Sequence, residues 1–239
     1  SVPVQMVDNG IGRLEISALQ PDKSGEMEPV TMLTQSNHWN YVKAAICEST
    51  LTDMDMVCCH PTLLVQIFEH CNQEVPVLKR YIKDRDKVQK QTGLSKRLFK
   101  KYLLSVLYYP HADESAVKNK LKKYGLSKEP ALLTKLRTEI KAASARVLEL
   151  YPCYTAAAVE SKGDDYFNIP GVALSLLAQT AEKKCVLALY RFWEERNVHV
   201  SALIHDGLHV DKEAATPAML PLAAEFIREQ TGYEVQLAY

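Results

Sequence analysis

Two short segments, far apart in the sequence, carry carboxylates in settings suited to a metal ion. The first is residues 203–210 (LIHDGLHV), in which two apolar runs flank a His-Asp-Gly tip. Asp-Gly between apolar runs is a strong signal for a β-hairpin, so we expect Asp206 at the tip. A carboxylate there could meet a metal-bound phosphate, provided that a second carboxylate joins it.

The second segment is residues 51–57 (LTDMDMV), which we expect to form a strand. Alternation places Asp53 and Asp55 on one face and Met54 and Met56 on the other. Two carboxylates beside apolar residues are costly unless a cation neutralises them. The alternative is an edge strand with two solvated aspartates, in which case no chemistry follows.

The net charge of zero conceals a strong asymmetry along the chain. Residues 79–146 hold 19 Lys and Arg against 6 Asp and Glu, and the rest holds 10 against 23. This pattern is typical of a protein that binds a polyanion with one subregion and keeps acidic groups in another. A solvated helical face is the alternative, but the excess runs over several predicted helices and so favours nucleic acid or nucleotide phosphates.

Within the basic segment, residues 96–108 read as a helix that Ser95 caps. Helical spacing places four side chains on one stripe: Arg97, Lys101, Ser105 and Tyr109, with Tyr108 beside the last. Two cations one turn apart suit a triphosphate, because each neutralises separate oxygens. The opposite face, with Leu98, Tyr102 and Leu103, is expected to pack inward. One helix can both bind phosphates and pack against the core, because the two roles use different faces.

The helices and strands that position these residues can be predicted from the spacing of apolar residues and from the prolines and glycines that end elements. The order is strand, helical insert, long helix, hairpin, helix and closing strand, which predicts an α+β fold. The first 40 residues look irregular. The expected helices span 39–46, 61–71, 76–91, 96–108, 113–124, 129–150, 168–197 and 217–230, and the closing strand spans 233–239.

These motifs together resemble the palm and fingers of family A nucleic acid polymerases, the group of bacterial repair polymerases and phage replicases. The metal-binding Asp at the end of a palm strand matches Asp55. The family's fingers helix has an Arg, a Lys four residues later and aromatic residues eight and twelve after the Arg. Arg97, Lys101 and Tyr109 match this pattern, and Ser105 stands in place of the first aromatic. The last palm motif matches His205-Asp206, with Gly207 in place of the usual Glu.

Two weaker matches lie in the same order along the chain. Gly12-Arg13-Leu14 followed by residues 17–20 (SALQ) is similar to the family's element that touches template and primer, and so implies roles for Arg13 and Gln20. Gln179 in the long helix is similar to the primer-contacting Gln.

The resemblance implies an antiparallel-sheet palm in residues 1–65 and 166–239, with an all-helical fingers insertion in 66–165. It implies a DNA polymerase that extends a primer on a DNA template with dNTPs, using two Mg²⁺ ions that Mn²⁺ can replace. The implied metal ligands are Asp55, Asp206 and the backbone carbonyl of Met56. Arg97 and Lys101 would contact phosphates, Tyr109 would seat the base, and His205 would support the primer end.

The chain also departs from the family. Its DNA polymerases have Glu five residues after the first Asp, near the sugar 2′ position, where this chain has His60. The choice between deoxy- and ribonucleotides therefore stays open. We expect no thumb or exonuclease ahead of Arg13, so further domains or subunits would supply processivity.

Three alternatives remain open. One is a non-catalytic nucleic-acid-binding descendant, which Ser105, Gly207 and His60 favour. Another is an RNA polymerase or primase on the same palm. A third is an unrelated metal-dependent phosphohydrolase that uses Asp53, Asp55 and Asp206.

Bulk composition narrows the class of protein. The 239 residues are 47% apolar and 24% charged, as in globular domains, and no apolar run is long enough to span a bilayer. No secretory signal opens the sequence. The six cysteines lack disulfide-scaffold or metal-finger spacing, which favours a reduced intracellular protein.

Overall fold

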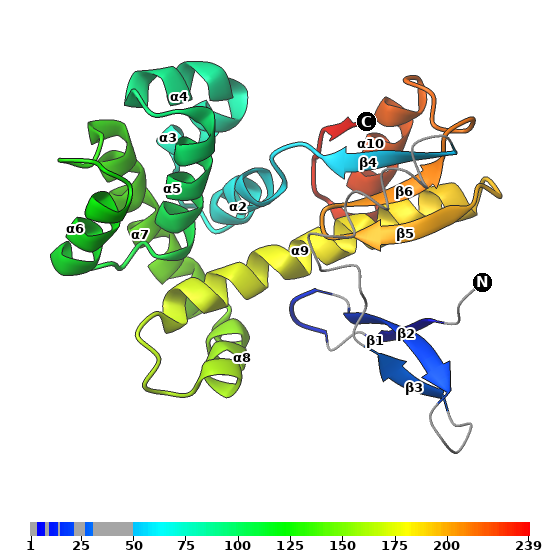
Figure 1. Ribbon diagram of the computed structural model, residues 1–239, viewed down its shortest axis with the longest axis horizontal. Helices are drawn as coiled ribbons and strands as arrows, with labels where there is room; N and C mark the ends of the chain where they lie inside the picture. Colours follow the sequence, from blue (N-terminus) through cyan, green and yellow to red (C-terminus); the bar gives the residue numbers. More distant parts are fainter. Residues whose placement is uncertain (1–3, 8–9, 14, 22–26, 31–49) are drawn as a thin grey trace. The chain divides into compact units, whose positions relative to one another are not determined.

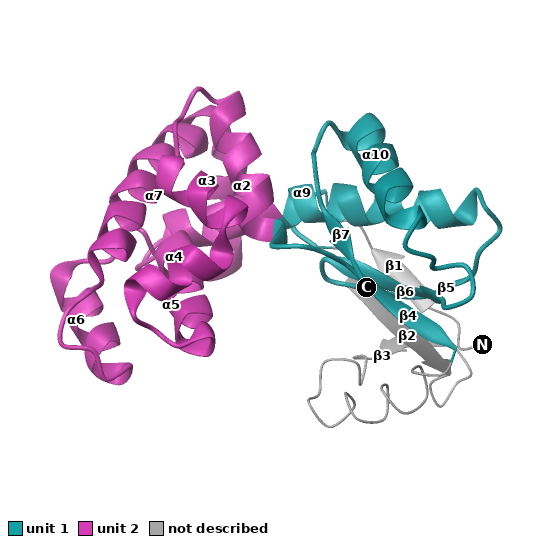
Figure 2. Ribbon diagram, turned by 90° about the horizontal axis from the view of Figure 1, so that it is seen from above, with its two compact units in different colours: residues 1–59, 179–239 teal, residues 60–178 magenta. Residues whose placement is uncertain are grey.

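The computed structural model describes residues 4–7, 10–13, 15–21, 27–30 and 50–239 (Figure 1). It has the mixed α+β composition that the sequence predicts. Contacts divide the chain into two compact units (Figure 2). Unit 1 comprises residues 1–59 and 179–239, and unit 2 comprises residues 60–178. The division thus falls after 59 and 178, whereas the predicted insertion spans 66–165.

A four-stranded antiparallel sheet forms the centre of unit 1. Its order is β5 (Val200–Ile204), β6 (Gly207–Asp211), β4 (Leu51–Met56) and β7 (Leu237–Ala238). The strand predicted around Asp53 and Asp55 is therefore confirmed, and it is an inner strand of the sheet. The closing strand has only two residues instead of the predicted seven, since it pairs only with the end of β4.

One face of this sheet is apolar and lies toward two helices. Met54 and Met56 of β4 are buried together with Leu208 and Val210 of β6. Figure 2 shows α9 (Ile169–Glu194) and α10 (Met219–Thr231) on one side of the sheet. They supply further core residues, including Cys185, Leu189, Phe192, Trp193, Ala223 and Ile227. Alternation along β4 then leaves Asp53 and Asp55 on the other face.

The N-terminal region corrects one prediction. Three strands form a separate antiparallel sheet in the order β1 (Val4–Val7), β2 (Glu15–Pro21) and β3 (Met27–Val30), where the sequence looked irregular. Prolines and polar residues obscured the alternation: Pro21 is the last residue of the central strand β2 and Pro29 lies in the edge strand β3, and a proline within a run argues against a strand. The helix predicted over 39–46 lies outside the described residues.

Unit 2 is helical in the part of it that precedes α9. Its helices are α2 (Cys59–His70), whose first residue belongs to unit 1, α3 (Pro76–Lys83), α4 (Arg85–Thr92), α5 (Lys96–Tyr108), α6 (Glu114–Lys123), α7 (Ala131–Leu150) and α8 (Pro152–Lys162). The single helix predicted over 76–91 is wrong. It breaks at Asp84, whose side chain accepts a hydrogen bond from the Lys87 amide and caps α4. The helix α8, which begins with Pro152, was not predicted from the sequence.

The basic helix α5 begins and ends where the sequence predicts. The Ser95 side chain accepts a hydrogen bond from the Leu98 amide at 3.3 Å, and the helix ends at Tyr108. Phe99, Tyr102 and Leu103 are buried, as the amphipathic pattern requires, although Leu98 is only half-buried. None of the described helices is long and apolar enough to cross a bilayer.

Candidate active site

The pairing of β4 with β6 brings the two predicted acidic segments together. Asp55 lies opposite Gly207 in the antiparallel register, and the Met56 amide donates a hydrogen bond to the Asp206 carbonyl at 2.9 Å. Directly opposed residues have Cβ positions about 5 Å apart. Asp55 and Asp206 therefore lie on neighbouring segments at one end of the sheet.

The hairpin turn is shifted by one residue from the predicted position. His205 and Asp206 form the two-residue turn, and Gly207 already belongs to β6. His205 carries the positive φ of the turn, at 33°. Histidine is among the residues that tolerate this conformation better than most. The Asp-Gly pair thus located the hairpin correctly, but it placed Gly207 in the turn, whereas Gly207 is the first residue of β6.

Gly207 has a different role, which is to allow a close approach by Asp55. A Cβ built on Gly207 would lie 2.1 Å from Asp55 Oδ1 and 2.3 Å from the Met54 carbonyl oxygen. Both distances are far below ordinary contact, so a side chain at position 207 would displace Asp55 and its strand. This is a physical reason for glycine at a position where the resemblance leads one to expect glutamate.

Like charge accumulates around Asp55. Partial burial first, and then the charges of Asp53 and Asp206, raise the pKa of its carboxyl from 3.8 to about 6. Asp53 also hydrogen-bonds to Asp55 through its side chain. On the far side of Asp53, His209 Nε2 lies 3.7 Å from Asp53 Oδ1. The sheet therefore presents three neighbouring carboxylates, one of them with a histidine beside it.

The donor set suits Mg²⁺ bound together with a substrate. Within the described residues, no group of three or more His, Cys, Asp or Glu side chains forms a ready-made metal cage. Mg²⁺ is typically held by one or two carboxylates plus substrate phosphates and water. Asp55 and Asp206 provide such a pair, and a divalent cation would offset the burial and the like charges that raise the pKa of Asp55. The residues present therefore fit the ion.

Arg13 lies in unit 1 as part of a tightly bound loop. Its guanidinium contacts Glu182 of α9, with Nη2 to Oε2 at 3.1 Å, and the Glu182 side chain is only 1% exposed. The Gly12 amide donates to Thr180 Oγ1 at 2.8 Å, and Lys183 Nζ donates to the Gly10 carbonyl at 3.0 Å. Sequence reasoning missed Glu182, since an acid inside a long helix gives no local signal of its partner.

This ion pair borders the acidic cluster. Burial raises the pKa of the Cys59 thiol, and the charges of Glu182 and Asp206 both add to that rise. The Arg13–Glu182 pair and Asp206 therefore lie close to the same buried thiol, directly after β4. The Arg13 side chain is 39% exposed beside its bond to Glu182, and its predicted role at a primer or template stays a prediction.

The predicted nucleotide-binding residues belong to unit 2. Arg97 and Lys101 are exposed on α5, and Ser105 is half-buried on the same stripe. Ser105 accepts a hydrogen bond from Lys120 of α6, a lysine that the sequence analysis did not single out. Tyr109 lies just after the helix, with its ring 5.5 Å from the exposed ring of Phe167 in an edge-on arrangement.

His60 contacts Tyr108 at the end of α5. The Tyr108 hydroxyl and His60 Nδ1 are hydrogen-bonded, and the two rings are perpendicular with centroids 5.7 Å apart. The backbone of Tyr108 is held as well, because Asn168 Nδ2 donates to its carbonyl at 2.8 Å. The last turn of α5 and the start of α2 are thereby joined at the position that differs from the polymerase pattern.

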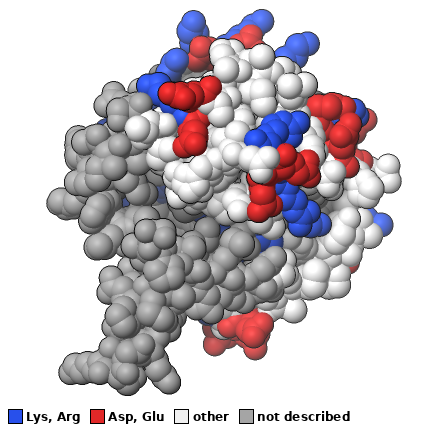
Figure 3. Space-filling model, turned by 90° about the vertical axis from the view of Figure 1, so that its right-hand side faces the viewer, with Lys and Arg blue, Asp and Glu red and all other residues white. Residues whose placement is uncertain are grey.

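The remaining predicted residues lie in unit 1. His205 is exposed in the hairpin turn, and Gln179 is half-buried in α9. Gln20 pairs with Glu28 in the β2–β3 register, and its side chain lies outside the described part of the chain. Figure 3 shows one face of the molecule, on which acidic and basic side chains are interspersed. The roles of all these residues stay predictions.

Comparisons with known proteins give distant matches. No protein-family model matches the chain. It is 27% identical over 210 residues to the putative helicase V13 of the Sputnik virophage, a match that covers 82% of the chain. The chain spans about a quarter of the length of that protein (25%). In fold it is similar to the POL domain of Pol1 from M. smegmatis in complex with DNA primer-template and dNTP. That likeness has a TM-score of 0.46 at 8% identity, and covers 93% of this chain and 46% of the other.

Proposed function

We propose that this chain is the catalytic part of a template-directed nucleotidyltransferase, a DNA polymerase that extends a primer 3′ end. The observation that carries the proposal is the juxtaposition of Asp55 and Asp206, 151 positions apart in sequence, at one end of the unit 1 sheet. The raised pKa of Asp55 supports it, since such perturbation is typical of catalytic and metal-binding carboxylates.

In this proposal Asp55 and Asp206 hold two Mg²⁺ ions, with the Met56 carbonyl as a further ligand. The bound ions would supply activation of the primer hydroxyl and neutralisation of the triphosphate. The residues of the chain bind and orient the reactants. Arg97 and Lys101, exposed one turn apart on α5, contact the phosphates of the nucleotide.

The virophage relative agrees with an action on nucleic acid. That relative is named a putative helicase, and this chain spans a quarter of it. Our proposal concerns that quarter alone, and places a nucleotidyltransferase in it. Further activities and partners of a longer protein would belong to other regions.

The test is a primer-extension assay on a DNA template with dNTPs and either Mg²⁺ or Mn²⁺. Asp55→Ala and Asp206→Ala should each abolish extension and leave DNA binding nearly intact, because neither change removes a cationic contact. Asp211→Ala, at the opposite end of β6, is the matched acidic control and should extend normally. Robust extension by either active-site variant would remove the proposed roles.

The same assay separates the alternatives. A non-catalytic descendant would bind the primer-template and never extend it with either metal. An RNA polymerase or primase would incorporate rNTPs in preference to dNTPs. A phosphohydrolase would release phosphate from nucleotides in the absence of any template.

A further inference from the structure

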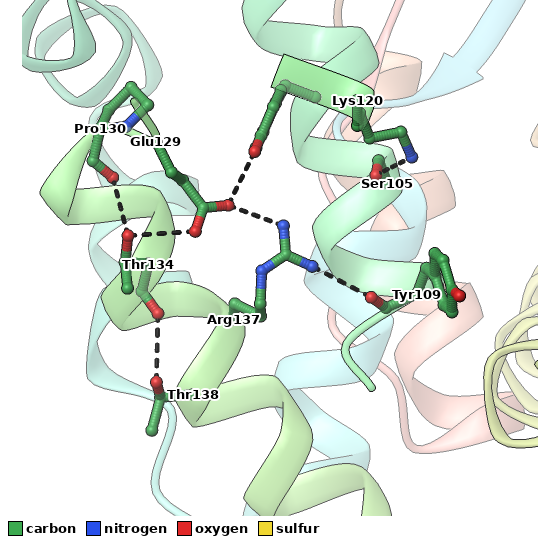
Figure 4. A network of polar contacts seen from close by, with 9 residues as sticks. Ser105, Tyr109, Lys120, Glu129, Pro130, Thr134, Arg137 and Thr138 are labelled. Atoms are coloured by element: carbon green, nitrogen blue, oxygen red, sulfur yellow. Dashed lines mark hydrogen bonds and ion pairs between the residues drawn. The ribbon is translucent and has the colours of Figure 1, made fainter. Parts of the chain in front are cut away.

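Lys120 of α6 reaches across to α5 at the end of the cationic stripe. Its ammonium donates a hydrogen bond to Ser105 Oγ (Figure 4). Ser105 lies one helical turn after Lys101 and two turns after Arg97, at about 6 Å per turn of four residues. The contact therefore extends the stripe by a third cation, which comes from a different helix.

The surroundings of Lys120 are cationic. Lys120 is half-buried, and burial lowers the pKa of its ammonium, as do the positive charges of Arg137 and Lys123. No carboxylate in the described part of the chain forms an ion pair with it. A half-buried ammonium that has no carboxylate partner of its own is unfavourable unless an anion joins it.

Arg137 shows the contrast within the same network. Its guanidinium forms an ion pair with Glu129 at 2.6 Å, and both side chains are almost buried, at 11% and 10% exposed. It also donates to the Tyr109 carbonyl at 3.0 Å. Glu129 accepts further hydrogen bonds from Tyr102 and Thr134 (Figure 4). The charge of Arg137 is thus balanced inside the fold, whereas that of Lys120 is directed to a hydroxyl on the stripe.

We infer that Ser105 and Lys120 form a phosphate-binding site, and that it takes the polyphosphate of a nucleoside triphosphate. A lysine ammonium and a serine hydroxyl both donate to phosphate oxygens, and a polyphosphate carries enough negative charge to meet several cations in a row. Continuity with Arg97 and Lys101 favours a nucleotide lying along α5. This inference rests on the proposed function, adds Lys120 to its nucleotide site and gives Ser105 a phosphate contact there.

The experiment measures binding of inorganic tripolyphosphate to the full chain by calorimetry, without metal or template. Lys120→Met should weaken binding about tenfold, as expected for one charge-assisted contact. Ser105→Ala should weaken it less, and Lys120→Arg should retain most of the affinity. Lys122→Met is the matched control, since Lys122 lies on the same helix and is exposed. It should change affinity less than twofold.

A second arm uses a single-stranded DNA oligonucleotide, because its backbone phosphates share the same chemistry. If Lys120→Met weakens oligonucleotide binding but leaves tripolyphosphate binding unchanged, the site is a backbone contact and the inference is wrong. Equal effects of Lys120→Met and Lys122→Met on tripolyphosphate would also overturn it. Because this arm needs no catalysis, its failure is distinct from the failure of primer extension. Unchanged melting temperatures would show that the variants fold.

Discussion

The Met56 amide donates a hydrogen bond to the Asp206 carbonyl, 2.9 Å away, and so joins the end of β4 to the hairpin turn. The bond is made by backbone atoms, next to the β4–β6 ladder in which Asp55 lies opposite Gly207. The placement of the two acidic segments therefore does not depend on their carboxylates. Substitutions of Asp55 or Asp206 should leave the sheet in place, which makes them clean tests of chemistry.

Asp55→Asn should stabilise the metal-free chain at neutral pH. The pKa of Asp55 is raised from 3.8 to about 6, first by burial and then by Asp53 and Asp206. The native state thus binds more protons than the unfolded state between these pH values, and the free energy of unfolding falls as pH rises from about 4 to 6. The asparagine side chain carries no charge, so Asp55→Asn removes this loss of stability. We expect a gain of about 1 kcal/mol, reduced by solvent screening of a partly exposed group, or about 2–4 °C in melting temperature.

The measurement is thermal unfolding in a chelator at pH 7.5 and pH 4. The gain should shrink at the lower pH, where the native aspartate is already protonated. Asp211→Asn, at the far end of β6, should show no such difference between the two pH values. A variant that melts at or below the wild-type temperature at pH 7.5 would contradict the repulsion inferred here.

Gly207→Ala should weaken divalent metal binding as well as the fold. The new methyl group would meet the Met54 carbonyl oxygen and Asp55 Oδ1, at 2.3 Å and 2.1 Å before any relaxation. Overpacking of this kind costs about 1–3 kcal/mol and would displace the Asp55 carboxylate. Thermal unfolding and Mn²⁺ titration should both report the change.

Ser201→Ala in β5 is the control for Gly207→Ala, because Ser201 is exposed in the same hairpin. It should leave both measurements near the wild-type values. Wild-type Mn²⁺ affinity in Gly207→Ala would show that the Asp55 carboxylate does not need the space above the glycine.

The acidic site was largely predictable because its signals are local. Alternation of two aspartates with two methionines defines β4, and an Asp-Gly pair between apolar runs locates the hairpin. The resemblance implied that the two acidic segments meet, and the pairing of β4 with β6 that brings them together was not itself predicted. The turn was misplaced by one residue because Gly207 serves a cross-strand approach and not the turn conformation, a demand that only the partner strand reveals.

Other parts could not be predicted because their causes are distant in sequence. Glu182 lies 169 positions from Arg13, and neither residue signals the other. Lys120 belongs to a lysine-rich helix in which every member looks alike, and only the packing of α6 against α5 selects it. The apolar residues of 76–91 follow helical spacing, but Asp84 caps a new helix there and so divides the segment into α3 and α4.

Arg137→Met should destabilise the chain by about 3 kcal/mol, because it leaves a nearly buried carboxylate without its cation. Burial alone would raise the pKa of Glu129, but the hydrogen bonds and charge of Arg137 outweigh it and hold that pKa below its usual value. A lowered native pKa contributes stability that is present above the unfolded pKa and is lost as pH falls through the native one. The loss in the variant should therefore be large at pH 7 and smaller below about pH 4, as measured by denaturant unfolding.

Arg146→Met is the matched control for Arg137→Met, since Arg146 forms an exposed pair with Glu149 on the same helix. It should cost no more than about 0.5 kcal/mol at either pH. Equal losses in the two arginine variants would mean that the buried pair contributes no more than a surface one.

Arg13→Ala should destabilise unit 1, since it removes a cationic partner of the Glu182 carboxylate, whose side chain is 1% exposed. Because Arg13 is itself 39% exposed, water can enter its place, and we expect about 2 kcal/mol instead of the larger values of fully buried pairs. Glu182→Gln should cost less, because the remaining guanidinium can turn to solvent. The double variant should be nearly as stable as Glu182→Gln alone, as measured by denaturant unfolding.

This non-additivity is the informative quantity, since residues in direct contact show coupling that distant pairs do not. Arg13→Ala combined with Arg228→Ala provides the additive reference, because Arg228 pairs with Glu225 elsewhere in unit 1. If Arg13→Ala and Glu182→Gln add like that distant combination, the ion pair does not fasten the loop of residues 10–13 to α9. If they couple, the side chain predicted to contact primer or template is first a structural anchor, and any loss of primer binding in Arg13→Ala must be read against its loss of stability.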